Sequence, residues 1–312
     1  MDVDSSTASA SLLNSTFNDS KADVILRTSD GVDFMMYKTL LSLSSSFFDG
    51  MFSLPQPDSV KIDQNGLPIV PVPESSAATE KLLMFIHPAH APVLESLDDI
   101  RLVLEPAIKY DMTAVSKRIV AQMERFINAE PLQAYCVAWQ FKLRDQVGRA
   151  AKRLLTRPLL PRRFVKELDL VPATALHRLH EYHYNCGKAA RAVSTAFGWI
   201  DVASFVRFDA GGICCDCANG NEPVTGYDNQ SISPRTWWLD YMRESATLLQ
   251  QRPCGDTVKD PELLNKVFKW AVQCRYCKDR VFTEMQEFAE EFAVEIERAT
   301  DMIELNIKRD FF

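Results

Sequence analysis

Two pairs of cysteines have the spacing of metal-binding thiols. Cys214 and Cys217 form one C-x-x-C pair, and Cys274 and Cys277 form a second pair later in the chain. Two thiolates separated by two residues can reach the same ion, and two such pairs supply the four sulfur ligands of a tetrahedral Zn²⁺ site, at roughly 2.3 Å per bond. The spacing therefore makes these four cysteines the candidate ligands of one structural Zn²⁺ ion.

Other residues could replace or complete that ligand set. Cys215 lies inside the first pair and Cys254 follows Pro253, while His183 and Cys186 are three residues apart on a predicted helix and so project to neighbouring positions. The same cysteines could instead be buried small apolar groups, or they could carry redox chemistry. The sequence leaves these three interpretations open.

A catalytic site has little support in the residue pattern. Cys186 near His183 offers a nucleophile and a base, but neighbours on one helix rarely provide an orienting third group or an oxyanion hole. The sequence contains no G-x-S-x-G, no phosphate-binding P-loop and no G-x-G-x-x-G motif. We expect no enzymatic activity and assign no catalytic residue.

Composition and charge favour a folded protein that does not bind nucleic acid. Of the 312 residues, 46% are hydrophobic and 25% are charged. The net charge of 35 − 42 = −7 argues against a phosphate backbone as the principal partner. The basic residues between Arg144 and Lys166 are expected to pair with an acidic C-terminal helix.

The ends of the sequence and its apolar runs suggest no membrane partner. The N-terminal stretch MDVDSSTASASLLNS lacks the positive start and apolar core of a secretory signal. No run reaches the roughly 18 apolar residues of a membrane span. We therefore expect an intracellular protein, cytoplasmic or nuclear.

The N-terminal part predicts a small sheet with helices. After a polar tail over 1–20, the Asp30-Gly31 pair predicts a hairpin turn between two strands. Apolar residues at offsets of three and four predict one helix from Lys38 to Phe52. Three prolines confine 67–73 to an edge strand or an extended segment. Further helices are expected over 77–86, after the N-cap Ser96, and from a cap at Asp111 to Ile127.

The later part of the chain is predicted to be helical around an irregular segment. Helices are expected over 129–200 and 257–312, the latter starting at Asp260-Pro261, and an irregular segment with several cysteines over 201–256. The Trp237-Trp238 pair is expected in the core. Residues 282–303 carry a heptad seam whose packing, within one chain or between two, the sequence does not decide.

Asp23-Val24 opens the first predicted strand, and Ser45-Ser46-Phe47-Phe48, followed by Met51-Phe52, closes the first predicted helix. With these motifs, the segment over 21–128 resembles a BTB/POZ domain, most closely the variants found in large families of basidiomycete fungal proteins. The resemblance implies an α+β fold that is mostly α, with the domain followed by a helical C-terminal region.

The resemblance also implies a function. BTB/POZ domains are interaction modules, so we expect a scaffold that self-associates as a homodimer or binds partner proteins. In that family dimerisation buries the first helix and strand. The residues expected to serve both core and interface are Leu40, Leu41, Leu43, Phe47 and Phe48.

Two alternatives follow from the same sequence. The first is a substrate adaptor for a cullin-type ubiquitin ligase, but Tyr37 replaces a usual histidine, and the stretch over 75–79 lacks the bulky apolar residue that such adaptors generally present. These departures argue against cullin docking. The second alternative is a zinc-containing regulatory protein that uses the cysteine cluster.

Overall fold

The chain forms two compact units, Met1–Ala129 and Glu130–Phe312. The computed structural model describes residues 17–55, 62–87, 92–160, 164–200, 223–226, 231–232 and 234–307. Residues 1–16 of the predicted polar tail therefore lie outside the described residues. The predicted class, α+β and mostly helical with a small N-terminal sheet, is confirmed.

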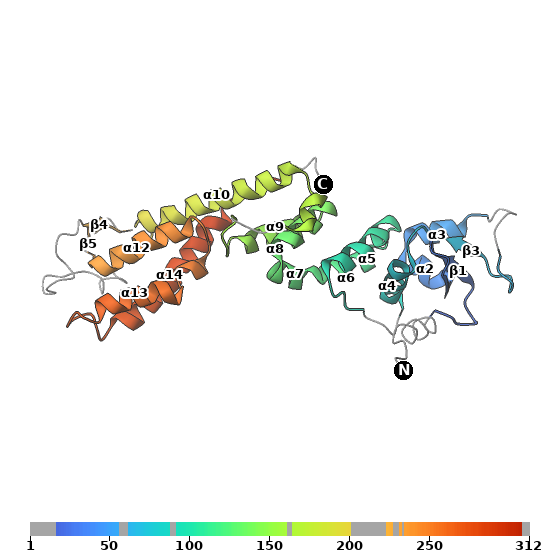
Figure 1. Cartoon of the computed structure of the whole chain (residues 1–312), viewed down its shortest axis with the longest axis horizontal. Coiled ribbons are helices and arrows are strands. Elements are labelled where there is room, and N and C mark those ends of the chain that lie inside the picture. The colour runs from blue at the N-terminus through green and yellow to red at the C-terminus, as the bar shows by residue number, and fades with distance from the viewer. Residues whose placement is uncertain are drawn as a thin grey trace, which may run out of the picture. The chain divides into compact units, whose positions relative to one another are not determined.

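A three-stranded sheet opens the first unit (Figure 1). Strands β1 (Val24–Arg27) and β2 (Asp33–Met36) pair antiparallel, as the hairpin prediction required, and Gly31 takes the left-handed φ of +80° that its turn needs. Strand β3 (Ile69–Pro71) pairs parallel with β1 and occupies an edge, where its proline removes no ladder donor.

Six helices complete the described part of the first unit. They are α2 (Lys38–Ser44), α3 (Ser46–Ser53), α4 (Ser76–Ile86), α5 (Leu97–Lys109), α6 (Thr113–Ala121) and α7 (Met123–Ala129). Ser96 caps α5 as predicted, because its hydroxyl accepts from the backbone N–H of Asp99 at 3.0 Å. Ile25, Leu41, Phe48 and Ile100 are among the fully buried side chains.

Two predictions for this unit were wrong. The single helix from Lys38 to Phe52 is two helices, because Ser45 is extended, with φ −148° and ψ 117°. Its hydroxyl caps α3 by accepting from the N–H of Phe48 at 3.1 Å. Asp111 does not cap α6, whose N-cap is Met112 without a side-chain bond. Asp111 instead has a φ of +51°, and its carboxylate accepts a hydrogen bond from Ser46.

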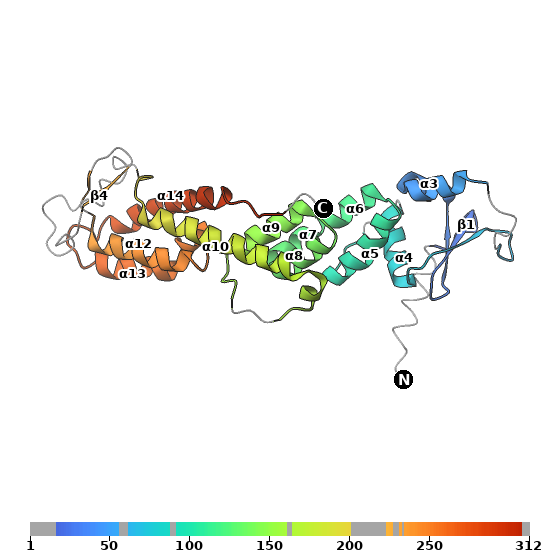
Figure 2. The ribbon, with the colours of Figure 1, turned by 90° about the horizontal axis from the view of Figure 1, so that it is seen from above.

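The second unit is built on helices. They are α8 (Pro131–Gln140), α9 (Arg144–Leu154), α10 (Ala173–Thr195), α12 (Thr236–Leu249), α13 (Pro261–Ala271) and α14 (Val281–Asp301). Short 3₁₀ helices η1 (Lys166–Leu170) and η3 (Gly255–Thr257) and a small hairpin of β4 (Val224–Thr225) and β5 (Ser231–Ile232) complete its described elements. Helix α10 lies alongside both α12 and α14 (Figures 1 and 2).

One expectation for this unit also needs correction. We expected 201–256 to be irregular, but α12 lies within it. In the helical region predicted over 129–200, Lys142 has a φ of +58° and lies in the turn between α8 and α9. Asp260-Pro261 starts α13 as predicted, and the carboxylate of Asp260 accepts from the N–H of Glu262 at 3.0 Å.

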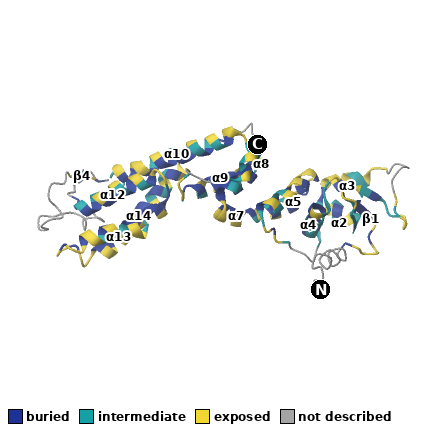
Figure 3. Ribbon diagram, viewed as in Figure 1, coloured by how far each residue is buried: buried dark blue, intermediate teal, exposed yellow. Residues whose placement is uncertain are grey.

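The core of the second unit contains the middle of the heptad seam. Met285, Ala289, Phe292 and Ile296 of α14 are all buried, so this part of the seam packs within this unit, whereas Phe282 at its start is 47% exposed. Trp237 and Trp238 join the same core, as predicted. Figure 3 shows α12, α13 and α14 with buried residues toward one another and exposed residues outward.

One predicted charge pairing is confirmed. Lys152 of the basic stretch forms ion pairs with Glu297, at 3.5 Å, and with Asp301, both on the acidic helix α14. These groups are about half exposed, so the pairs contribute little to stability, about 1 kcal/mol at most.

Candidate functional site

The first candidate site is the apolar surface of α2 and α3. Leu41 and Phe48 point into the core, whereas Leu43 is 80% exposed and Phe47 is 49% exposed. Leu40 is half-buried. Of the five residues predicted for core and interface, two are therefore committed to the core of their own unit and three remain at the surface. We call the surface of Leu40, Leu43 and Phe47 the α2–α3 patch.

The Phe47 end of this patch is held by aromatic packing. The ring of Phe47 lies 5.4 Å from the rings of both Phe48 and Tyr110, between centroids. The Tyr110 hydroxyl donates to the carboxylate of Glu74, which also accepts from Lys109 at 2.7 Å. Burial, together with the Glu74 carboxylate, raises the pKa of the Tyr110 hydroxyl well above its ordinary value.

Tyr37 has a partner that the sequence did not reveal. Its hydroxyl donates to the carboxylate of Asp19, and this hydrogen bond lowers the pKa of that carboxyl. Nearby, the backbone N–H of Met35 donates to the carbonyl of Phe17 at 2.9 Å. Tyr37 and Phe17 therefore hold the residues before β1 against β2 and the start of α2.

The residues over 75–79 form the cap and the first turn of α4. This is the stretch that lacks the bulky apolar side chain generally present in cullin adaptors.

The second candidate site is the cysteine pair between α13 and α14. Cys274 and Cys277 are both buried, and their thiols interact. Burial, together with the Cys274 thiol, raises the pKa of the Cys277 thiol to about 11, while the nearby Arg235 guanidinium acts in the opposite direction. Cys214, Cys215 and Cys217 lie outside the described residues, so the predicted zinc ligand set stays a prediction.

The alternate ligands have partners of their own. His183 Nε2 lies 3.3 Å from the carbonyl oxygen of Arg157, and Cys186 interacts with the hydroxyl of Tyr182. The sulfur of Cys254 lies 3.4 Å from the hydroxyl of Thr257. Within the described ranges, no group of three or more His, Cys, Asp or Glu side chains could hold a metal ion.

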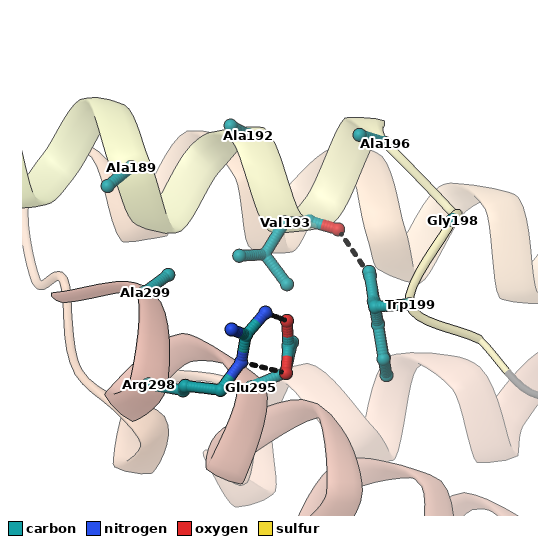
Figure 4. A pocket seen from close by; sticks show the side chains of 9 residues that line it. All are labelled: Ala189, Ala192, Val193, Ala196, Gly198, Trp199, Glu295, Arg298 and Ala299. Atoms are coloured by element: carbon teal, nitrogen blue, oxygen red, sulfur yellow. Dashed lines mark hydrogen bonds and ion pairs between the residues drawn. The ribbon is translucent and has the colours of Figure 1, made fainter. Parts of the chain in front are cut away.

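A surface hollow of about 710 Å³ lies between α10 and α14 (Figure 4). Small residues of α10 line one side: Ala189, Ala192 and Ala196. The indole N–H of Trp199 donates to the carbonyl of Val193 at 2.9 Å, and Arg298 donates to Glu295 at 2.9 Å. Arg298 and Glu295, which both line the hollow, therefore bind each other.

The comparison with known protein families gives a match within the first unit. A family model described as BTB/POZ domain matches residues 13–127. The BTB domain of zebrafish PATZ1 is 18% identical with a TM-score of 0.28, covering 40% of this chain and 98% of that one. The BTB domain of human gigaxonin is 18% identical with a TM-score of 0.27, covering 39% and 95%.

Two further findings complete the comparison. No curated protein matches the chain. Across the described residues, none of the helices is both long enough and apolar enough to cross a bilayer. The more specific resemblance to fungal proteins stays a prediction.

Proposed function

We propose that this chain is a scaffold that self-associates through its α2–α3 patch, because a BTB/POZ domain model matches residues 13–127 and such domains mediate protein–protein interaction. The fold of this domain is not enzymatic. For the whole chain, the absence of a catalytic residue stays a prediction.

The observation that carries the proposal is the exposure of Leu43. A leucine side chain that is 80% exposed gains roughly 1.5–3 kcal/mol when it is buried. In a two-fold interface the same patch is buried on both copies, so this contribution counts twice. Phe47 adds an aromatic face beside Leu43, and its ring is already held in place by Phe48 and Tyr110. An aromatic side chain fixed in this way loses little conformational freedom on binding.

The experiment is light scattering on the full chain across the micromolar range. We expect the mass of a dimer for the unchanged chain and of a monomer for Leu43→Glu, because a buried unpaired carboxylate opposes association. Val93→Glu is the matched control, since Val93 is a similarly exposed apolar residue of the same unit, at 62%. It should remain a dimer.

Two results would contradict the proposal. One is a monomer for the unchanged chain throughout the micromolar range. The other is a dimer that persists in Leu43→Glu while circular dichroism shows an intact fold. Because Leu43 is 80% exposed, its substitution should leave the fold of each copy intact, and any fall in the unfolding temperature should follow from the loss of association.

A further inference from the structure

The connection between α13 and α14, over 272–280, carries two free cysteines on its inner side. Seven of its nine residues are exposed, and the two buried ones are Cys274, at 5% exposure, and Cys277, at 6%. Both cysteine side chains belong to the core cluster of the second unit. Arg275 and Tyr276, which lie between the cysteines in sequence, are exposed. The two thiols are therefore on the same side of the connection.

The backbone between the two cysteines forms a tight turn. The N–H of Cys277 donates to the carbonyl of Cys274 at 3.2 Å, and this hydrogen bond closes a four-residue turn. The Cα atoms at the two ends of such a turn are less than about 7 Å apart, and those of a disulfide are usually about 4.4–6.8 Å apart. The two thiols also interact with each other. The reduced pair is therefore already placed for closure into a disulfide.

The other cysteines of the described ranges have no comparable arrangement. They are Cys136 on α8, Cys186 on α10 and Cys254 just before η3. All three are buried, but none of them belongs to the core cluster that contains the pair of the α13–α14 connection. Within the part of the chain that the structure describes, only this pair joins two thiols in one turn and one cluster.

We propose that Cys274 and Cys277 are a redox-active pair that closes reversibly into an intrachain disulfide, with a low-molecular-weight disulfide such as oxidised glutathione as the oxidant. One cysteine sulfur attacks a sulfur of the oxidant, which forms a mixed disulfide and releases one reduced glutathione. The second cysteine sulfur then attacks the mixed disulfide at the protein sulfur, which forms the intrachain S–S bond and releases the second reduced glutathione. Two electrons and two protons thus pass from the two thiols to the oxidant.

The exposure of the rest of the connection gives the oxidant a route to the pair. A segment with most of its residues in solvent and few buried contacts opens locally at a lower free-energy cost than global unfolding. Such opening exposes the two thiols while the helices on either side stay folded. This inference concerns the second unit, so it is independent of self-association through the α2–α3 patch.

The test is oxidation of the full chain, purified under reducing conditions without chelator and then exposed to millimolar oxidised glutathione. Remaining thiols are alkylated in urea, and the chain is digested with trypsin. Cleavage after Arg275 places Cys274 and Cys277 in separate fragments, 270–275 and 276–278. We expect mass spectrometry to find these two fragments joined by a disulfide, and to find them separate and alkylated after reduction with dithiothreitol.

The single variants Cys274→Ser and Cys277→Ser should stop at the first step. In each, the remaining cysteine of the pair should retain one glutathione, because no second thiol is present to displace it. Cys136→Ala and Cys186→Ala are the matched controls, since these buried cysteines lie outside the cluster, and both should close the disulfide as the unchanged chain does.

A comparison on the unchanged chain does not depend on whether the variants fold. Because the turn holds the two sulfur atoms together, half closure in the native chain should occur at a value of [GSH]²/[GSSG] about tenfold higher than in urea. Equal values in the two conditions would overturn the proposal. So would separate alkylation of both cysteines after oxidation, a bond from either one to a different cysteine, or closure only after a chelator has removed a metal ion.

Discussion

Ser45 and Tyr110 are joined by a buried hydrogen bond across 65 positions of sequence, in which the serine hydroxyl donates to the tyrosine carbonyl. The same hydroxyl accepts from the N–H of Phe48. One side chain therefore ends α2, starts α3 and ties both helices to the end of α5.

Replacement of Ser45 by alanine should destabilise the first unit. The variant loses a helix cap and the donor to a buried carbonyl, so we expect the free energy of unfolding to fall by about 1–3 kcal/mol. Amide hydrogen exchange, followed by mass spectrometry on peptides from β1 to α3, would measure the change. Ser53→Ala is the control, since Ser53 is exposed and bonds only within its own helix, and it should change stability by less than about 0.5 kcal/mol. Equal protection in both variants would contradict this role for Ser45.

Gly187 marks the close approach of α10 to the end of α12. A Cβ atom there would lie 2.9 Å from the carbonyl oxygen of Gln250, which is backbone and can yield only if the helices move apart. We therefore expect Gly187→Ala to lower the stability of the second unit by about 1–3 kcal/mol. Urea unfolding followed by tryptophan fluorescence is the measurement, because all five tryptophans lie in this unit.

The matched control is Gly148→Ala. Gly148 is also helical, in α9, but an added Cβ would meet nothing within 4 Å. Alanine is the better helix former, so this variant should be more stable by up to about 1 kcal/mol. If both substitutions shifted stability in the same direction, the close approach at Gly187 would not be the cause.

The buried thiol of Cys186 should react only in alkaline solution. Burial raises its pKa to about 11, so the thiolate fraction at pH 8 is about 10⁻³. Alkylation of the native chain by iodoacetamide should therefore accelerate about tenfold per pH unit above pH 8, whereas in urea it should level off near the ordinary cysteine pKa of about 8.5.

The raised pKa of Cys186 also determines how the stability of the folded chain changes with pH. Because the folded chain holds the proton more tightly than the unfolded chain, the stabilisation is complete below pH about 8.5 and is lost as the pH rises toward about 11. Peptide mass spectrometry would quantify the alkylation of Cys186. Rapid modification of the native chain at neutral pH would show that this thiol is accessible and ordinary.

Turn and cap residues in the sequence predicted the element boundaries that depend on neighbouring residues. Asp30-Gly31 specified the hairpin, Ser96 the start of α5, and Asp260-Pro261 the start of α13. The break at Ser45 could not be found in this way, because the apolar periodicity continues through it and the bond to Tyr110 comes from far along the chain.

In the candidate sites, too, some features follow from local sequence and others depend on contacts between distant residues. Leu41 and Leu43 are two residues apart, about 200° around a helix, so helical geometry alone implies that only one of them faces the core. That signal was available and would have separated the surface residue from the core residue. The contact between Tyr37 and Asp19 was not available, because it depends on how the residues before β1 return to the start of α2.

Both edge strands of the small sheet in the first unit carry features that limit pairing with a further strand. The N–H of Met35 on β2 is taken by the carbonyl of Phe17, and β3 ends in Pro71, which has no N–H to offer. An antiparallel bridge between Ile62 and Pro68 lies next to β3. These features leave a strand from another molecule fewer backbone groups to pair with at either edge, and they oppose amyloid-like stacking. Loss of Phe17 would leave the N–H of Met35 open to such a strand.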